Sequence, residues 1–448
     1  MKPVEERRIQ SCAERSRHPK APDVAEDIQN QAQIGSRRIE IWKGRFGFWW
    51  GLQLHSIIIL SEMSLKLNIL LLAIAACIPH IYSRLSLLYT IETTNDPAKL
   101  STPRGWITEK GSYEIKYANK LRNCEDLVVD DKAGYVVLGC DEGRDVWNTV
   151  MGVFGKTTPP NGQLYLYDYS RSQPSLESIR LLNTPSGYSF HPLGLSLHLA
   201  TDTLLAVNHG TPGSTVDQFH FSRLGNSATF VKSISSPYLR APNAVVQISN
   251  TEVLVTNDHF FTPRKSPWLN KIETYLGLPL GGVTYLNLKS GETQQIARMP
   301  YANGLAVLNS TTIAVASSSS AKVFLYEMDK TTTPPTLAYK EAISTPFWPD
   351  NLHVADGKLF IAGHAQLAAL AKLSKSRQHC GADTTSAGCD AKAPSYVARW
   401  TRKKGLEDVY VGTEIYSSSG VAMDEKRGVS VISGLYGKGL LIWNKEQK

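Results

Sequence analysis

The stretch ANGLAVLNSTTIAV, residues 302–315, is one copy of a unit that recurs along the chain after residue 112. The unit has one or two polar residues, an apolar run, a turn of Asp, Asn or Gly, and a second apolar run. Short apolar runs separated by turn residues predict β-hairpins. The other copies are EDLVVDDKAGYVVL (125–138), LGLSLHLATDTLLAV (193–207), PNAVVQISNTEVLV (242–255), DNLHVADGKLFIA (350–362) and SGVAMDEKRGVSV (419–431).

The spacing of these copies favours one all-β architecture. The six copies begin at residues 125, 193, 242, 302, 350 and 419, so successive starts differ by 68, 49, 60, 48 and 69 residues. Each interval can hold a four-stranded blade and a variable loop, which predicts a six-bladed β-propeller over residues 113–448. A β-sandwich with similar hairpins is the alternative. Closure of a propeller requires the last strands, GVSVISG and KGLLIW, to pair with a strand near Tyr113–Lys120.

The composition is that of a large folded protein. The chain has 448 residues, of which 42% are hydrophobic and 20% charged, so it can bury a large core. Its formal net charge is +8, but the basic residues are scattered among acidic ones and form no stripe interleaved with aromatics. Nucleic acid is therefore not an expected partner.

The cysteines argue against one kind of metal site and leave disulfides open. None of the six belongs to a CxxC pair, so zinc is not expected. Cys380 and Cys389 lie in a polar insertion that could close as a small disulfide loop, and Cys124 and Cys140 flank a predicted hairpin. Either pair could also stay reduced.

The N-terminal region divides into three predicted segments. Residues 1–62 lack periodicity and are predicted to be disordered, either as an artefact of the gene model or as a cytosolic tail. Residues 63–91 carry Lys66 and then an apolar run, the pattern of a signal peptide or signal-anchor. Residues 92–112 are expected to be a linker. These features predict a secreted or lumenal protein, membrane-anchored if the segment is not cleaved.

Polar side chains, mostly carboxylates and amides with two histidines, recur at matching places in the hairpins. They stand at the start of a first strand (Glu125, Asn303, Asp350 and Asn351) or at the end of a second strand (Asn208-His209, Asn257-Asp258 and His364). Antiparallel strands bring these two places together, so we expect the residues to meet at one mouth of a central channel. The Asn and Asp residues, taken singly, are also common turn residues. Their recurrence predicts a calcium site, because calcium prefers carboxylate and amide oxygens.

Blocks between residues 113 and 444 resemble the paraoxonase/arylesterase family in order and spacing. They are CEDL (124–127), LAVNHGTPGSTVDQFHF (205–221), TNDHFF (256–261), ETYLGLP (273–279), YANGL (301–305) and PDNLHV (349–354). The resemblance implies calcium-dependent hydrolysis of carboxylic esters or lactones, with two calcium ions in the channel. It implies a catalytic ion held by Glu125, Asn257, Asn303, Asp350 and Asn351, and a structural ion held by Asp126, Asp258 and the carbonyl of Leu195.

The catalytic base is the part of the resemblance that the sequence leaves unsettled. His209, in the VNH motif, matches the second member of the family's histidine dyad. The first histidine should precede the glycine of an HG pair, whereas this chain has Leu193 there, in HPLG (191–194). His191 has the same strand parity and is an alternative. The base that activates water could be His209, His191 or a calcium-bound carboxylate such as Asp350.

Other functions stay open at this point. The replaced dyad histidine favours a propeller that binds and does not catalyse, with calcium as a structural ion. A gluconolactonase-like or strictosidine-synthase-like propeller is a further alternative, although the TNDHFF and VNH blocks argue against it. The family's disulfide from first to last strand has no counterpart, because no cysteine follows Cys389.

Two features concern the surface of the protein. Residues 268–280, WLNKIETYLGLPL, have apolar residues at helical spacing and are predicted to cap the site or to lie on a membrane. Packing in the core is the alternative. Asn309 begins an N-glycosylation sequon in a predicted hairpin turn, which suits a lumenal or extracellular domain.

Overall fold

The computed structural model describes residues 65–381, 386 and 388–445. The extension predicted over residues 1–62 lies outside the described residues. The chain divides into two compact units, residues 1–79 and 80–448, and all the described strands belong to the second. The described helices are α3 (Leu65–Thr94), α4 (Trp106–Glu109), α5 (Pro267–Leu276) and α6 (Leu367–Cys380), with the short 3₁₀ turns η1 (Glu142–Asp145) and η2 (Ser318–Ser320).

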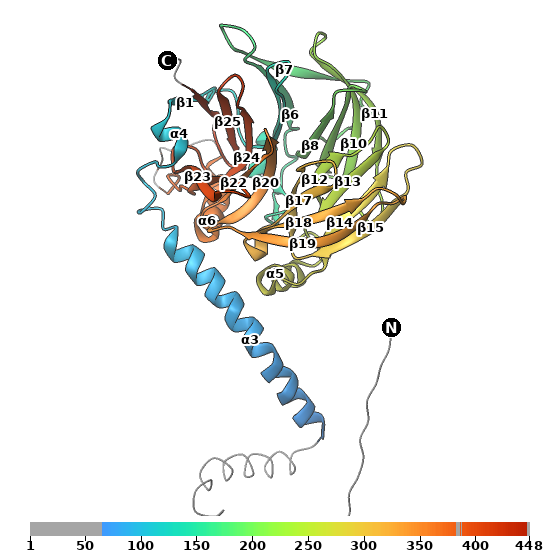
Figure 1. Cartoon of the computed structure of the whole chain (residues 1–448), viewed down its shortest axis with the longest axis vertical. Helices are drawn as coiled ribbons and strands as arrows, with labels where there is room; N and C mark the ends of the chain where they lie inside the picture. The colour runs from blue at the N-terminus through green and yellow to red at the C-terminus, as the bar shows by residue number, and fades with distance from the viewer. Residues whose placement is uncertain (1–64, 382–385, 387, 446–448) are drawn as a thin grey trace, which may run out of the picture. The chain divides into compact units, whose positions relative to one another are not determined.

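The strands form sheets around a common centre (Figure 1). Six strands lie innermost, and each packs against the next in a closed ring. They are the first strands of the sequence repeats. In ring order they are β2 (Cys124–Asp130), β8 (Pro192–His198), β12 (Pro242–Gln247), β16 (Ala302–Val307), β20 (Trp348–Ala355) and β24 (Ser418–Asp424). The described structure is therefore mostly β, with a propeller-like arrangement.

From each inner strand the sheet continues outward through antiparallel neighbours. The outer strands β7 and β11 also pair with each other in parallel, so two runs share one eight-stranded sheet. The remaining strands are β3 (Tyr135–Cys140), β6 (Gln163–Asp168), β7 (Ser175–Leu182), β9 (Thr203–Gly210), β10 (Gly213–Ser222), β11 (Ser227–Ile234), β13 (Glu252–Asn257), β14 (Gly281–Asn287), β15 (Thr293–Met299), β17 (Thr312–Ser317), β18 (Lys322–Asp329), β19 (Thr336–Ser344), β21 (Lys358–His364), β22 (Ser395–Thr401), β23 (Gly405–Gly412), β25 (Val429–Gly434), β26 (Leu440–Asn444), β1 (Ser112–Lys116) and the small pair β4 (Trp147–Asn148) and β5 (Val153–Phe154).

The first and last strands of this β structure close the ring. β1 pairs antiparallel with β26, from Ser112 opposite Asn444 to Lys116 opposite Leu440. The sequence predicts a pairing of this kind, and the register confirms it.

Apolar strand residues fill the spaces between neighbouring sheets. One cluster joins Leu138 of β3 to Val431 of β25 and Ile442 of β26, and all three side chains are buried. Burial of one such side chain contributes about 1.5–3 kcal/mol to stability. Because each sheet packs on two neighbours, its apolar faces are fully covered only when the ring is complete.

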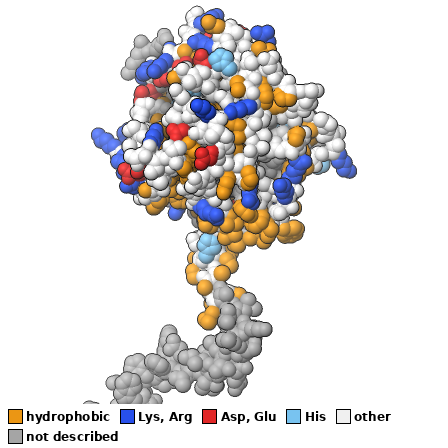
Figure 2. Space-filling view, turned by 90° about the vertical axis from the view of Figure 1, so that its right-hand side faces the viewer, with side chains coloured by type: hydrophobic (Ala, Val, Ile, Leu, Met, Phe, Trp, Pro, Cys, Tyr) orange, Lys and Arg blue, Asp and Glu red, His pale blue; other side chains and the backbone are white. Residues whose placement is uncertain are grey.

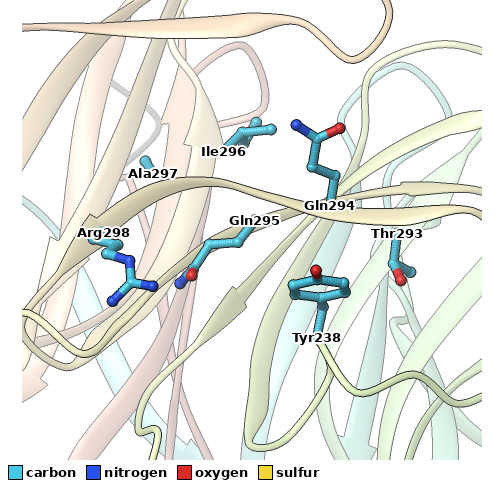
Figure 3. A pocket seen from close by; sticks show the side chains of 7 residues that line it. All are labelled: Tyr238, Thr293, Gln294, Gln295, Ile296, Ala297 and Arg298. Carbon is cyan, nitrogen blue, oxygen red and sulfur yellow. The ribbon is translucent and has the colours of Figure 1, made fainter.

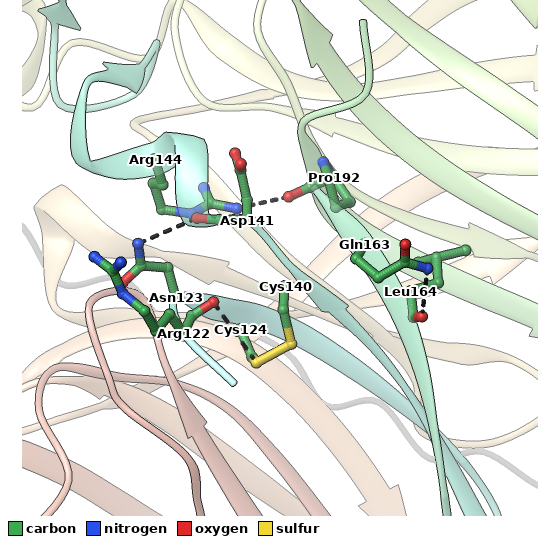
Figure 4. The surroundings of a disulfide bond; sticks show 9 residues. All are labelled: Arg122, Asn123, Cys124, Cys140, Asp141, Arg144, Gln163, Leu164 and Pro192. Atoms are coloured by element: carbon green, nitrogen blue, oxygen red, sulfur yellow. Dashed lines mark hydrogen bonds between the residues drawn. A yellow bond between two sulfur atoms is a disulfide. The ribbon is translucent and has the colours of Figure 1, made fainter. Parts of the chain in front are cut away.

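Two disulfides form among the described cysteines. Cys124–Cys140 joins β2 to β3 at the first residue pair of their hairpin, and Cys380–Cys389 closes a loop after α6. Figure 4 shows the first bridge close to η1, where Arg144 donates to the carbonyl oxygen of Pro192 at 2.6 Å. The sequence names both pairs, and in the structure both are bonded.

The end of the predicted signal segment is packed into the second unit. In the C-terminal part of α3, Ile91 is buried together with Ala321 and Trp348. The stretch expected to be a linker, residues 92–112, is packed as well, with Leu100 buried between sheets. Among the described helices, none is both long and apolar enough to cross a membrane.

Candidate metal and active site

Each inner strand carries an irregularity at the same place. Where it pairs with its neighbour, the register shifts after the first residue pair, or after the second in β20, so one or two inner residues have no cross-strand partner. Bulges of this kind redirect side chains away from the regular sheet pattern. The residues in the six bulges are Glu125, Leu193-Gly194, Asn243-Ala244, Asn303-Gly304, Asp350-Asn351 and Ser419.

Two bulges need glycine because the next inner strand approaches closely. A Cβ on Gly194 would lie 2.4 Å from the carbonyl oxygen of Asn243, and one on Gly304 would lie 2.3 Å from that of Asp350. Any side chain at these positions would push neighbouring strands apart. Glycine therefore lets the bulge residues of adjacent strands come together.

Three bulge asparagines are oriented by hydrogen bonds from their amide nitrogens. The bonds run from Asn243 to Asp258 (3.3 Å), from Asn303 to the Ser318 hydroxyl (2.9 Å) and from Asn351 to Glu125 Oε1 (3.0 Å). The amide oxygen of each asparagine is buried without a hydrogen-bond partner, and so is Glu125 Oε2. Buried acceptors of this kind are costly unless a cation or water meets them. Carboxylate and amide oxygens together fit calcium.

Burial dominates the electrostatics of the carboxylates at this place, although Arg144 partly offsets it at Glu125. Burial, reinforced by nearby Asp350 and Asp126, raises the pKa of Glu125 well above its usual value. Burial likewise raises the pKa of Asp126 to about 7, opposed by hydrogen bonds from backbone N–H groups. A bound cation would favour the ionised form of both groups.

Histidine, cysteine and carboxylate side chains do not by themselves make a metal site here. In the described part of the chain, no group of three or more of them is arranged to hold a metal ion. The oxygens at the bulges differ in kind, because amides supply three of the four unpartnered carboxylate and amide oxygens there, and the Ser419 hydroxyl is unpartnered as well.

A cavity of about 520 Å³ opens over the bulges. Its lining includes the bulge residues Glu125, Leu193, Asn243, Asn303 and Asp350. Side chains of α5, of α6 and of residues 150–153 complete the wall, together with the apolar groups of Trp348 and Leu435. Polar groups and apolar surface thus lie side by side, as in sites for small organic molecules.

One histidine in the cavity wall has a ring nitrogen without a partner. His364, at the end of β21, has Nε2 at 3.0 Å from Asp350 Oδ2. Because the carboxylate accepts, Nε2 donates and Nδ1 is the basic nitrogen. Nδ1 is buried and has no hydrogen-bond partner. His259 also lines the cavity, but both of its nitrogens are engaged, by Asp258 and Thr274.

Other predicted metal ligands lie near the cavity but outside its wall. Asn257 is the last residue of β13. Its amide oxygen accepts from the backbone N–H of Ala241 at 3.3 Å, and its amide nitrogen donates to the Thr284 hydroxyl at 3.1 Å. Asp126 and Leu195 do meet, through the Leu195 N–H, which donates to the carboxylate at 2.8 Å.

His209, a predicted base, is also absent from the wall of this cavity. Its Nε2 donates to the carbonyl of Pro242 at 2.6 Å, and its Nδ1 accepts from the Thr149 hydroxyl. Burial lowers the pKa of His209, so its ring is neutral near pH 7. Both nitrogens are occupied.

The two candidate positions in the segment HPLG, residues 191 and 193, lie in different surroundings. His191 is 2% exposed, and its Nδ1 pairs with Asp141 at 3.1 Å, outside the cavity wall. Leu193, where the family resemblance would place a histidine, lines the cavity.

Asn243 is the member of the oxygen group that the sequence prediction leaves out. It is the second residue of PNAVV, just as Asn303 is the second residue of ANGLA. Alignment of the repeats by their bulges would have identified it. The resemblance of the TNDHFF block points to Asn257 instead.

Two further hollows lie away from the bulges. The first, of about 900 Å³, includes His209 and Asp258 in its wall. The second, of about 670 Å³, lies along β15 beside Tyr238 (Figure 3). No residue named from the sequence lines the second hollow.

The ring of inner strands, with unpartnered carboxylate and amide oxygens beside a partly apolar cavity, defines a propeller-like protein with a central cavity. The model of the family described as Arylesterase matches residues 148–386. This is 239 of the 448 residues, or more than half of the chain. The chain belongs to the arylesterase family, and the resemblance seen in the sequence is confirmed.

Curated relatives match parts of the chain. Serum paraoxonase/arylesterase 1 of Mus musculus is 30% identical over 172 residues, which are 37% of this chain and 47% of the relative. The protein of the same name from Rattus norvegicus is 28% identical over 211 residues, 45% of this chain and 57% of the relative. The matched part thus spans about half the length of these relatives.

Solved structures also resemble the chain. A gluconolactonase from Xanthomonas campestris matches with a TM-score of 0.47 and 14% identity, over 78% of this chain and 97% of that one. The WD40 β-propeller domain of Doa1 matches with a TM-score of 0.39 and 11% identity, over 75% and 97%.

Proposed function

We propose that this protein hydrolyses carboxylic esters or lactones in the cavity over the bulges, with the help of calcium. The observation that supports this most directly is the group of four buried, unpartnered oxygens beside an apolar wall. An ester or lactone joins an apolar body to a carbonyl that gains negative charge when water attacks. An apolar surface beside a cation that stabilises this charge therefore suits such a substrate.

The proposed ligands of a catalytic calcium ion are Glu125, Asn243, Asn303, Asp350 and Asn351. Asn243 takes the place of Asn257 in the set implied by the resemblance, because the amide of Asn257 is engaged by Ala241 and Thr284. A bound calcium ion would supply Lewis-acid stabilisation of the developing oxyanion. Asp126, Asp258 and the Leu195 carbonyl are the proposed ligands of a second, structural ion.

We propose His364 as the base that activates water. Its Nδ1 is free to accept a proton, and Asp350 fixes the ring through Nε2. Asp350, one of the three bases named from the sequence, would thus act through His364. The other two, His209 and His191, lie outside the cavity wall.

We also propose that the fold is a six-bladed propeller and that the protein is secreted or lumenal. The closed ring of inner strands and the bulge repeated in each support a six-bladed propeller. The two disulfides support an oxidising compartment, in line with a secreted or lumenal protein. Asn309 lies in an exposed turn and accepts from the Thr311 hydroxyl at 3.2 Å, which leaves its sequon accessible for glycosylation.

Hydrolysis of phenyl acetate and of an aliphatic lactone, measured with calcium and with a chelator, tests the proposal. The variant Asn303→Ala removes a bulge oxygen, and Asn250→Ala is a control at an exposed turn. We expect chelation to abolish turnover and Asn303→Ala to lower it by about 100-fold. The control should match the wild type.

One outcome would favour the binding module over the enzyme. If calcium binds but no ester or lactone is turned over, hydrolysis is wrong. The protein would then be a propeller that binds a ligand, an alternative supported by Leu193 in the cavity wall.

A further inference from the structure

The larger of the two hollows away from the bulges, of about 900 Å³, is called the second cavity from here on. It lies beside the turn between β9 and β10 and the segment between β13 and α5. It shares one lining residue, Val150, with the cavity over the bulges. Of its lining, the proposed function uses only the buried Asp258, as a ligand of the second ion. Its size suits a small organic molecule.

The charges around this second cavity favour an anion. Its lining contains three cations, Arg240, Arg264 and Lys265, and one acid, Asp258. Asp258 is 2% exposed, and its two oxygens meet His259 at 2.7 Å and an asparagine amide at 3.3 Å. The three cations are exposed at the rim, so a ligand entering the cavity meets positive charge first.

Both guanidinium groups are held in place, with hydrogen-bond donors to spare. Arg240 donates from Nε to the Pro237 carbonyl at 2.9 Å and lies 4.1 Å above the ring centre of Phe260. Arg264 donates from Nη1 to the Thr211 carbonyl at 2.8 Å and lies 5.2 Å above the Trp147 ring. These contacts use one nitrogen of each group. The others can bind a carboxylate with two parallel hydrogen bonds.

An aromatic surface lies beside the cations and is fixed from behind. Phe260 and Phe261 line the cavity, with ring centres 5.0 Å apart. The carboxylate of Glu273, on α5, accepts from both of their backbone N–H groups at 2.9 Å. Asn270, also on α5, donates to the Phe261 carbonyl at 2.9 Å. The wall is therefore held by a helix and does not depend on the loop alone.

We propose that this second cavity binds a small organic carboxylate. The carboxylate pairs with the guanidinium groups of Arg240 and Arg264, and the apolar body packs on the phenylalanines. The acids released by ester or lactone hydrolysis have this chemistry, and that link alone rests on the proposed function. Binding itself requires no turnover.

Isothermal titration calorimetry with 2-naphthoate tests this site directly. The double variant Arg240→Gln/Arg264→Gln removes both positive charges at exposed positions. Two controls remove a cation elsewhere: Arg171→Gln on the surface, and Lys271→Gln in the wall of the first cavity. We expect the double variant to weaken naphthoate binding by at least about tenfold and the controls to leave it unchanged. The neutral alcohol 2-naphthalenemethanol should also bind at least about tenfold more weakly than the acid.

Four results would overturn the proposal. They are no binding of 2-naphthoate to the wild type, unchanged binding in the double variant, loss of binding in Lys271→Gln, and tighter binding of 2-naphthyl phosphate than of the carboxylate. Thermal unfolding of each variant checks that it is folded. Because no measurement depends on ester turnover, a protein without esterase activity can still pass or fail this test.

Discussion

The orientation of the Asn243 amide affects what the cavity over the bulges can bind. Asn243 ties its nitrogen to Asp258, so its oxygen is left without a partner. Leu193 lies in the corresponding bulge of the neighbouring strand and offers no polar atom. The chemistry of the ring therefore changes from one inner strand to the next while the backbone repeats.

Replacement of Asn243 should weaken calcium binding. In Asn243→Ala one of the four unpartnered oxygens is lost, so we expect the calcium Kd to rise by about tenfold or more, measured by titration calorimetry. Asn250→Ala, at the turn of the same hairpin, is the matched control. If Asn257→Ala weakens binding and Asn243→Ala does not, the ligand assigned from the family resemblance is the right one.

The repeats allow the sequence to place Glu125, Asn303 and Asp350 close together, and the structure does so. The register of a hairpin repeats with the chain, so residues at equivalent positions meet at one end. Side-chain direction is different, because it depends on partners far away in sequence. The amide of Asn257, for example, is turned away by Thr284 of another strand, which periodicity does not predict.

At the scale of elements, the C-terminal part of α3 contacts residues in the wall of the cavity over the bulges. The carboxylate of Glu92 accepts from the Trp348 indole at 3.1 Å and from the backbone N–H groups of Leu367 and Ala368 at 2.7 and 3.0 Å. It thus caps the start of α6 with a residue of another helix. Trp348 and Leu367 both line the cavity.

Loss of the Glu92 charge should loosen this wall. For Glu92→Gln we expect a loss of about 1 kcal/mol of stability, seen as a lower Tm. The KM for phenyl acetate should rise while kcat stays near the wild-type value, because Glu92 does not reach the bulges. Glu109→Gln, exposed at the end of α4, is the control. An unchanged KM would show that the cap serves stability alone.

The outward face of α5 carries exposed apolar side chains. Trp268 is 79% exposed, and Leu269 and Ile272 are also exposed. In Figure 2 hydrophobic side chains gather at the lower end of the body, where Figure 1 places α5. The other face of this helix, including Asn270 and Thr274, lines the cavity, so α5 also caps the site as the sequence predicts.

Binding to phosphatidylcholine vesicles measures this surface. We expect Trp268→Glu to lower the fraction of protein that sediments with vesicles, because it replaces a large exposed apolar group by a charge. Lys289→Glu, in an exposed turn between β14 and β15, changes charge elsewhere and should have little effect. Equal sedimentation of Trp268→Glu and wild type would rule out α5 as the contact.

The hairpins can be predicted from the sequence, whereas the packing of residues 92–112 cannot. The hairpins are predictable, because alternation and turn residues are local signals. The stretch 92–112 reads as a linker, because its few apolar residues, such as Leu100, follow no period. They are buried only through contact with sheets distant in the chain.

At the scale of the whole molecule, calcium and pH should act on stability together. The raised pKa of Asp126, about 7, and the raised pKa of Glu125 mean that the folded protein binds these protons more tightly than the unfolded chain. Their stabilising protons are present at low pH and are lost as pH rises through the folded-state pKa values. A metal ion would replace the lost protons.

Thermal unfolding between pH 5 and pH 8 tests this linkage. With a chelator present, we expect the Tm to fall as pH rises toward and past about 7, the range set by Asp126. With calcium, the fall should be smaller or absent. Equal pH profiles with and without calcium would mean that the buried carboxylates do not hold the ion.

The pairing of β1 with β26 also has a consequence for biosynthesis. The strand that completes the final sheet leaves the ribosome hundreds of residues before its partner, because β1 begins at Ser112 and β26 ends at Asn444. Until β26 has been synthesised, β1 lacks its partner, and the edges of the nascent ring are open to pairing with other chains. Termination of synthesis before β26 would therefore remove the strand that pairs with β1. Such a product would be a natural substrate for chaperones and quality control.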